Sequence, residues 1–106
     1  MTRILFICSR NRLRSPTAEA VFSGREGIEA LSAGTSPDAE LRVDADLIEW
    51  ADLIVAMERS HRRKLMRDFP RLMRDKKIAV LGIKDDYGYM QTELVALLER
   101  AMAPYL

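Results

Sequence analysis

The sequence has little of what several large classes of protein need. It holds one cysteine and one histidine in 106 residues, which excludes an internal disulfide and a metal site built from several cysteines. The formal net charge is only +1, so we expect neither nucleic acid nor an anionic membrane as a partner. No apolar run approaches the length of a membrane span. The first residues fit a short strand better than a signal peptide, and the reducing cytoplasm is the expected compartment.

What the sequence does contain fits one compact domain over residues 1–106. That length leaves no room for a second domain, and a hydrophobic content of 48% is ordinary for a globular protein. The basic residues are unusual in kind, because 13 of the 17 are arginine. Arginine is the side chain best suited to bidentate contacts with carboxylates and phosphates.

Short apolar runs alternate with helical spacings along the chain. Continuous β-favouring runs predict four strands, at residues 4–7, 28–33, 53–57 and 78–81. Amphipathic spacing predicts helices after Ser15, over 43–50, over 60–69 and through 94–102. Alternating strands and helices imply a parallel sheet with right-handed crossovers. The sequence therefore predicts an α/β fold, a single three-layer domain around a four-stranded parallel sheet.

The segment from Cys8 to Ser15, here called the Cys8–Ser15 loop, follows the first predicted strand directly. Ser15 is a good N-cap and Pro16 a good first helical residue, so the loop leads into a helix N-terminus. Backbone amides in such a turn can hold an oxyanion, and Arg14 can add a bidentate pair. The same positive surroundings favour the nucleophilic thiolate of Cys8. The predicted phosphate-binding residues are Ser9, Arg10, Asn11, Arg12, Leu13, Arg14 and Ser15.

Two side chains of the loop are expected to support it. The hydroxyl of Ser15 could donate a hydrogen bond to the Cys8 thiolate, and Asn11 tolerates left-handed backbone angles. The plain alternative is that a lone cysteine after a strand is a small buried apolar residue. The spacing from Cys8 to Arg14 is weak evidence in an arginine-rich chain. Its position between a buried strand and a Ser-Pro helix start favours the oxyanion site.

Beyond the loop, two polar residues are candidates for a role in the site. His61 lies in a charged stretch and is expected to be solvated, because charged helix faces point to water. Glu58 follows the third predicted strand, where an exposed or capping role is favoured over one that faces the pocket.

Four segments of the chain, in order, resemble the low-molecular-weight protein tyrosine phosphatases. They are residues 4–22, with a Cys-x5-Arg-Ser-Pro loop, residues 31–35, with Ser-Ala-Gly-Thr, residues 51–60, with Ala-Asp-Leu-Ile-x-Ala-Met, and residues 83–87. The order is informative, because the larger tyrosine phosphatases carry the Cys-x5-Arg loop late, with the acid upstream of it.

The resemblance implies a flavodoxin-like fold and a two-step hydrolysis. Cys8 would form a phosphocysteine, while Arg14 and the loop amides hold the equatorial oxygens. Asp85 would protonate the leaving phenolate and then activate water; Asp86 beside it is the alternative acid, with Glu58 next in line. Further roles are implied for three residues: Tyr87 and Tyr89 as pocket walls, and Ser32 as a support of the loop through Asn11.

The chain departs from the family pattern in three places. Arg10 stands where glycine is usual, and Lys84 and Asp86 replace prolines that flank the acid. The chain is also shorter than family members, mainly between Thr35 and Asp44, which indicates a compact, truncated branch and leaves the choice of substrate open.

The leading interpretation is a cytoplasmic phosphomonoesterase that acts on phosphotyrosine or a similar aryl phosphate. We expect no cofactor and no metal, a phosphate or sulfate ion as a ligand of the loop, a phosphorylated protein or small aryl phosphate as partner, and a monomer. Two alternatives remain open. One is a non-catalytic phosphate-binding or adaptor module, and the other is an arsenate reductase that relies on an external thiol, since the chain has no second cysteine.

Overall fold

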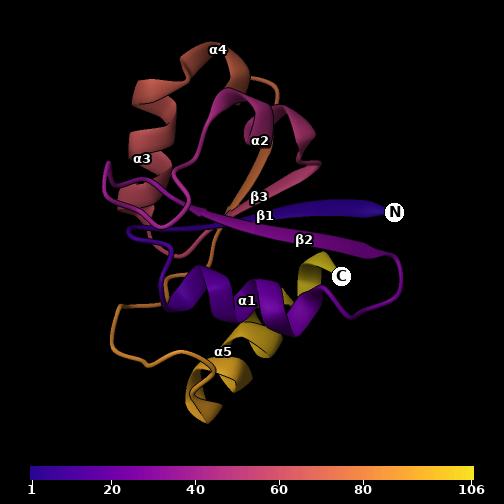
Figure 1. Ribbon diagram of the computed structural model, residues 1–106. Coiled ribbons are helices and arrows are strands. Elements are labelled where there is room, and N and C mark those ends of the chain that lie inside the picture. Colours follow the sequence, from indigo (N-terminus) through magenta and orange to yellow (C-terminus); the bar gives the residue numbers. More distant parts are fainter.

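The computed structural model describes all residues from 1 to 106 and is built on a four-stranded parallel sheet. The strands are β1 (Thr2–Cys8), β2 (Ile28–Gly34), β3 (Leu53–Ala56) and β4 (Lys77–Val80), in the spatial order β2-β1-β3-β4 (Figure 1). β1 pairs with both β2 and β3, and both of its faces are covered, which explains why its residues 4–7 are an unbroken apolar run with no exposed surface. The prediction of an α/β, flavodoxin-like fold with four parallel strands is confirmed.

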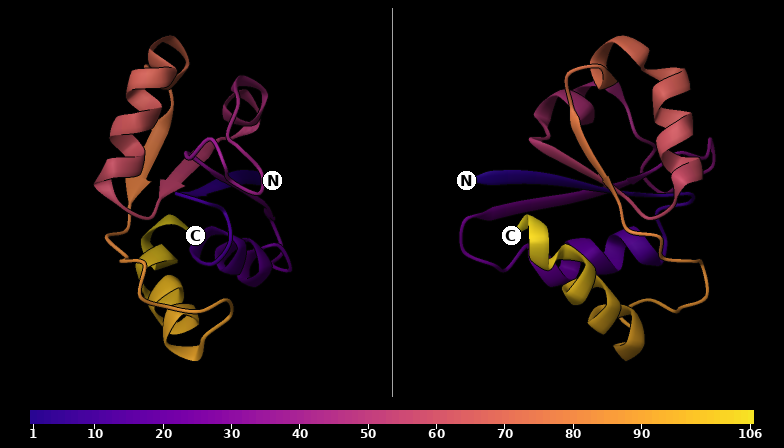
Figure 2. Two further views of the ribbon diagram at one scale, coloured as in Figure 1. Left: turned by 60° about the vertical axis from the view of Figure 1, so that its left-hand side comes forward. Right: turned by 180° about the vertical axis from the view of Figure 1, so that it is seen from behind.

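Helices cover both faces of the sheet. α1 (Arg14–Phe22) and α5 (Thr92–Met102) lie on one face, and α2 (Ala45–Trp50), α3 (Arg59–Asp68) and α4 (Pro70–Met73) lie on the other (Figures 1 and 2). A short 3-10 helix, η1 (Ala103–Tyr105), follows α5. None of the helices combines the length and the apolar character that crossing a bilayer requires.

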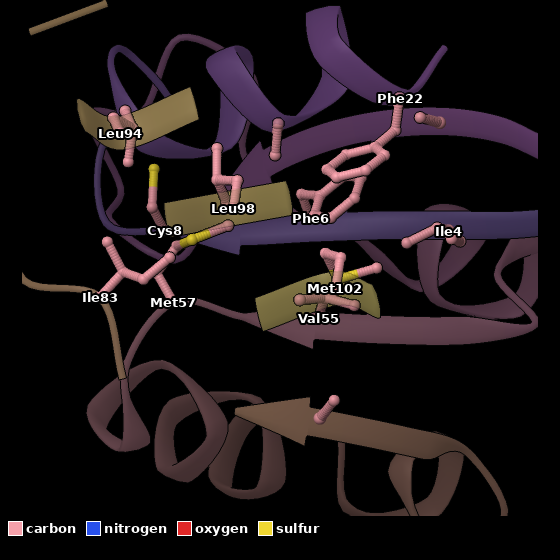
Figure 3. Close-up of a cluster of buried hydrophobic side chains, with 13 residues drawn as sticks. Ile4, Phe6, Cys8, Phe22, Val55, Met57, Ile83, Leu94, Leu98 and Met102 are labelled. Atoms are coloured by element: carbon pink, nitrogen blue, oxygen red, sulfur yellow. The ribbon is translucent and has the colours of Figure 1, made fainter. Parts of the chain in front are cut away.

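Side chains of β1 alternate between two hydrophobic cores. Ile4, Phe6 and Cys8 join the core beneath α1 and α5, whereas Leu5 and Ile7 join the core beneath α2, α3 and α4. In the first core the rings of Phe6 and Phe22 stack with their centroids 5.6 Å apart. The period of two along β1 therefore places the only cysteine in the core shared with α5 (Figure 3).

One local prediction was wrong at the start of a helix. α1 begins at Arg14 with Leu13 as its N-cap residue, so Ser15 lies inside the first turn and does not cap the helix. Pro70 follows the end of α3 and begins α4. Proline suits the first turn of a helix because its missing N–H would have no partner there.

The loops that follow β1 and β2 are joined at the carboxyl edge of the sheet. Thr35 N–H donates to Cys8 O (3.0 Å) and Ser36 N–H donates to Ser9 O (2.9 Å). Gly34 lies at the closest approach, because a Cβ there would be 2.4 Å from Ser9 O and 2.6 Å from Ala39 Cβ. No larger residue fits at this position without moving the Cys8–Ser15 loop.

Candidate active site

A pocket of about 670 Å³ opens at the end of β1. It is lined by Cys8, Ser9, Arg10, Arg12, Leu13, Arg14 and Asp85. Six of these residues come from the Cys8–Ser15 loop, and Asp85 comes from the loop after β4. Parallel strands end at the same edge of the sheet, and this edge therefore brings together residues from the two ends of the sequence.

The sulfur of Cys8 lies at the boundary between the pocket and the core. The residue is only 3% exposed, and its side chain lies near Leu94, Ile83 and Met57 (Figure 3). Ser15 Oγ is 2.9 Å from Cys8 Sγ, and it accepts a hydrogen bond from Asn11 Nδ2 (3.0 Å). Because Asn11 donates to Ser15, the hydroxyl proton of Ser15 can be directed at the sulfur, where it stabilises negative charge.

Asn11 connects the loop to β2. Its backbone is left-handed, with φ of 56°, as the sequence predicts for an asparagine in a tight loop. Asn11 Nδ2 also donates to Ser32 Oγ (2.9 Å), and Ser32 Oγ in turn donates to Glu19 Oε1 (2.7 Å). The bonds run in one direction from Asn11 to Glu19, and they fix the orientation of the asparagine amide.

Arg14 is buried, with 3% of its surface exposed, and is held in place by two acceptors. Its Nη1 donates to Glu58 Oε1 and to Ile83 O (2.8 Å). Its Nε is buried without a hydrogen-bond partner, 3.7 Å from Asp85 Oδ1. A buried donor without a partner is costly, which makes this N–H a ready contact for a bound anion.

His61 is a residue of the site that sequence reasoning placed in solvent, whereas Glu58 caps α3, as the sequence predicts, and also binds Arg14. The hydrogen bond from Arg14 is the main reason why the pKa of Glu58 lies below its usual range. His61 is 1% exposed, so the expectation that it is solvated was wrong. Its Nδ1 accepts from the Glu58 backbone N–H (3.0 Å), and its Nε2 is therefore the protonated nitrogen that donates to Ser9 Oγ (2.9 Å).

The buried position of His61 beside Arg14 affects its pKa. Burial, followed by the positive charge of Arg14, lowers its pKa to about 4. A signal for the contact does exist in the sequence, because Glu58 and His61 are spaced like the first and last residues of a capping box. His61 at the third helical position is turned back toward the strand end and away from water.

The remaining predicted residues lie at different distances from the pocket. Asp85 lines it, whereas Asp86 is exposed and does not. Tyr87 is half-buried against the core beneath α5, and Tyr89 is 57% exposed; neither lines the pocket. The assignment of Asp85 as the acid and of the two tyrosines as walls stays a prediction.

Comparison with known proteins finds similar sequences and similar folds. The family model described as low molecular weight phosphotyrosine protein phosphatase matches residues 3–50. The low molecular weight protein tyrosine phosphatase of T. tengcongensis is 25% identical, with all of both chains covered and a TM-score of 0.76. A mutant of the YwlE arginine phosphatase, whose active-site serine is phosphorylated, is 28% identical, with 99% of this chain and 95% of that chain covered and a TM-score of 0.75.

Two further matches are a structural neighbour with bound phosphate and a much longer protein. The tyrosine phosphatase Wzb of Escherichia coli K30, in complex with phosphate, has a TM-score of 0.75 at 23% identity over 97% of this chain and 94% of that one. A histidinol-phosphate aminotransferase of Aeromonas salmonicida (strain A449) is 30% identical over 107 residues, and the chain spans only 27% of its length. The chain is therefore similar to the low molecular weight phosphotyrosine protein phosphatases, in sequence over residues 3–50 and in fold over its whole length.

Proposed function

We propose that the chain hydrolyses aryl phosphate monoesters, phosphotyrosine among them, through a phosphocysteine at Cys8. The observation that carries the proposal is the buried, unpartnered Nε of Arg14 in the same pocket as the Cys8 sulfur. A donor without a partner and a sulfur that accepts from Ser15 are what an incoming phosphate and a thiolate nucleophile require.

In the first step the thiolate of Cys8 attacks phosphorus, and the bond from phosphorus to the phenolic oxygen breaks. Asp85 in its acid form gives its proton to the departing oxygen. Arg14 and the backbone amides of the loop hold the equatorial oxygens, with Glu58 and Ile83 O keeping the guanidinium in place.

In the second step the carboxylate of Asp85 takes a proton from a water molecule, whose oxygen attacks phosphorus. The bond between sulfur and phosphorus breaks, inorganic phosphate leaves, and the thiolate of Cys8 is restored. The cycle consumes one ester and one water, and it needs no cofactor. A free thiol as the nucleophile fits a reducing compartment, and we propose the cytoplasm.

A second candidate substrate is phosphoarginine, because one structural neighbour is an arginine phosphatase. The exposed Arg10 and Arg12 at the mouth of the pocket speak against it, since they would repel a cationic leaving group. We therefore place the aryl ester first.

Steady-state hydrolysis of p-nitrophenyl phosphate, phosphotyrosine and phosphoarginine by the wild-type chain and by Cys8→Ser tests the proposal. We expect turnover of both aryl esters by the wild type and none by the variant. Quenching with an alkaline denaturant during turnover should trap one phosphoryl group on the wild-type chain, at Cys8, which peptide mass spectrometry locates. Thermal unfolding of Cys8→Ser shows whether it is folded.

Three outcomes would contradict the proposal in different ways. Turnover by Cys8→Ser at the wild-type rate would remove the nucleophile assignment. Binding of inorganic phosphate without turnover of any ester would indicate a phosphate-binding module. Hydrolysis of phosphoarginine alone would make the second candidate correct.

A further inference from the structure

Two arginines of the Cys8–Ser15 loop are not used by the proposed chemistry. Arg10 and Arg12 are exposed, and both line the pocket that holds Cys8. Arg10 makes no ion pair with any carboxylate of the chain. Arg12 Nε is 3.3 Å from Glu40 Oε1, and the two side chains are 51% and 65% exposed. An ion pair this exposed is weak, so Arg12 can exchange Glu40 for another anion at little cost.

The segment after β2 already presents carboxylates to these arginines. Glu40 N–H donates to Arg10 O (3.0 Å), which places the segment along the rim of the pocket. Asp38 lies in the same segment and accepts from the Ser36 hydroxyl. That hydrogen bond is the main reason for its lowered pKa, and the charges of Arg10 and Arg12 contribute as well. The rim therefore already brings carboxylates of this chain, at Asp38 and Glu40, close to the two arginines.

The apolar part of the pocket is small by comparison. Besides Cys8, Leu13 is the only hydrophobic residue that lines it. Tyr87 packs against the core and Tyr89 lies outside the lining, so an uncharged aromatic ring gains little contact here. Charge, more than apolar contact, distinguishes this pocket from the surrounding surface.

We propose that Arg10 and Arg12 select phosphate monoesters that carry a second anionic group, a carboxylate or a further phosphate, next to the scissile phosphate. Arg14 binds the phosphate that is hydrolysed, and Arg10 and Arg12 bind the second anion in place of Glu40. The inference rests on the proposed phosphatase function and names its substrate class. The second anion can belong to an acidic side chain beside a phosphorylated residue or to a small phosphorylated acid.

A matched pair of esters isolates this charge. 4-Carboxyphenyl phosphate and 4-carbamoylphenyl phosphate have nearly the same shape, and only the first carries a second anion. For the wild type at low salt we expect a kcat/KM about tenfold higher for the carboxylate ester, with a ratio that falls as salt is added. The Arg10→Gln/Arg12→Gln variant should lose the preference. The Arg71→Gln/Arg74→Gln variant removes the same charge from exposed positions on and after α4 and should keep it.

Binding measurements separate the inference from the proposed function. Calorimetry on Cys8→Ser with 4-carboxybenzylphosphonate and 4-carbamoylbenzylphosphonate reports the preference without turnover. A preference for the carboxylate without hydrolysis by the wild type supports the inference and overturns the proposed function. Hydrolysis with equal kcat/KM for both esters overturns the inference alone, and binding of neither phosphonate overturns it as well.

A further experiment with peptides identifies the source of the second anion. Phosphotyrosine peptides with Glu or Gln directly before the phosphotyrosine repeat the comparison in a protein-like substrate. Preference for the Glu peptide supports the inference with a protein as the source. Equal rates for the two peptides, beside a preference among the small esters, support it with a small phosphorylated acid as the source.

Discussion

The two sides of the Cys8–Ser15 loop differ in almost every property that affects a side chain. Asn11, Arg14 and Ser15 are at most 7% exposed, and each bonds to another residue of the loop or to another element. Arg10 and Arg12 are exposed; Arg12 pairs with Glu40 at the surface, and the charges of both arginines help to lower the pKa of Asp38. The buried side fixes the geometry of the loop, and the exposed side is free to meet a ligand. Changes on the buried side should therefore affect every substrate alike, and changes on the exposed side should affect the choice among substrates.

The largest effect is expected at Asp85, which faces the pocket opposite the loop. Asp85→Asn should lower kcat by about a hundred- to ten-thousand-fold for phenyl phosphate, because the departing phenolate needs its proton. The loss should be smaller for p-nitrophenyl phosphate, whose leaving group needs less protonation. Asp86→Asn is the matched control, since Asp86 is exposed and outside the lining. If Asp86→Asn widens the gap between the two esters instead, Asp86 is the acid.

Arg14→Lys should break the buried side directly. An ammonium cannot contact Glu58, Ile83 O and a phosphate oxygen in one plane, so we expect a loss of about a hundred- to a thousand-fold in kcat. The loss should be equal for 4-carboxyphenyl and 4-carbamoylphenyl phosphate. Arg12→Lys keeps its charge on the exposed side and should cost far less. A selective loss for one ester in Arg14→Lys would contradict the division between the two sides.

His61 should make the stability of the fold depend on pH. Its pKa is about 4 in the folded chain against 6.5 for the free side chain, so the unfolded chain binds an extra proton between these values. The free energy of unfolding should therefore be highest above pH 6.5 and fall by up to about 3 kcal/mol as the pH drops toward 4. Urea denaturation across this range measures it.

The control for His61 is the His61→Gln variant, which does not titrate. It should lose less stability than the wild type over the same pH range, even if it is less stable at neutral pH. Parallel curves for the two proteins would show that His61 is not the group responsible.

The smallest effect is expected at Ser32, which supports the buried side from β2. Ser32→Ala removes the acceptor of one Asn11 bond and the donor to Glu19, and it should cost about 1–2 kcal/mol of unfolding free energy. The exposed Ser23→Ala should change stability by no more than about 0.5 kcal/mol. Ser32→Ala should keep the preference for 4-carboxyphenyl over 4-carbamoylphenyl phosphate. Loss of this preference would mean that the buried and exposed sides of the loop are coupled.

Much of the fold could be predicted because buried strands and helix faces are apolar in sequence. The runs at Ile4–Ile7 and Leu53–Ala56 are continuous because both faces of those strands are covered. Ser15 was misassigned because a serine before proline satisfies the local rule for a cap, whereas its partners, Cys8 and Asn11, lie elsewhere in the loop. Local rules do not register such competition.

The missed part of the site has the same origin. His61 is surrounded in sequence by charged residues, which gave it the pattern of a solvated face. It contacts Ser9, 52 positions earlier, and Glu58, whose own ion pair with Arg14 joins the start of α3 to α1. Contacts of this range follow from the order of strands in the sheet, which composition and spacing do not specify.

The position of Cys8 beside an unpartnered arginine donor has a consequence for the life of the protein under oxidative stress. The sulfinate and sulfonate forms of an oxidised cysteine are tetrahedral or nearly so and negatively charged, as a phosphate is. A pocket that binds phosphate would therefore also stabilise these oxidised forms of Cys8. No second thiol is present to intercept the sulfur earlier as a disulfide. An anion bound in the pocket would protect Cys8, because it keeps peroxide away from the sulfur. Phosphate bound in the pocket would then shield the sulfur.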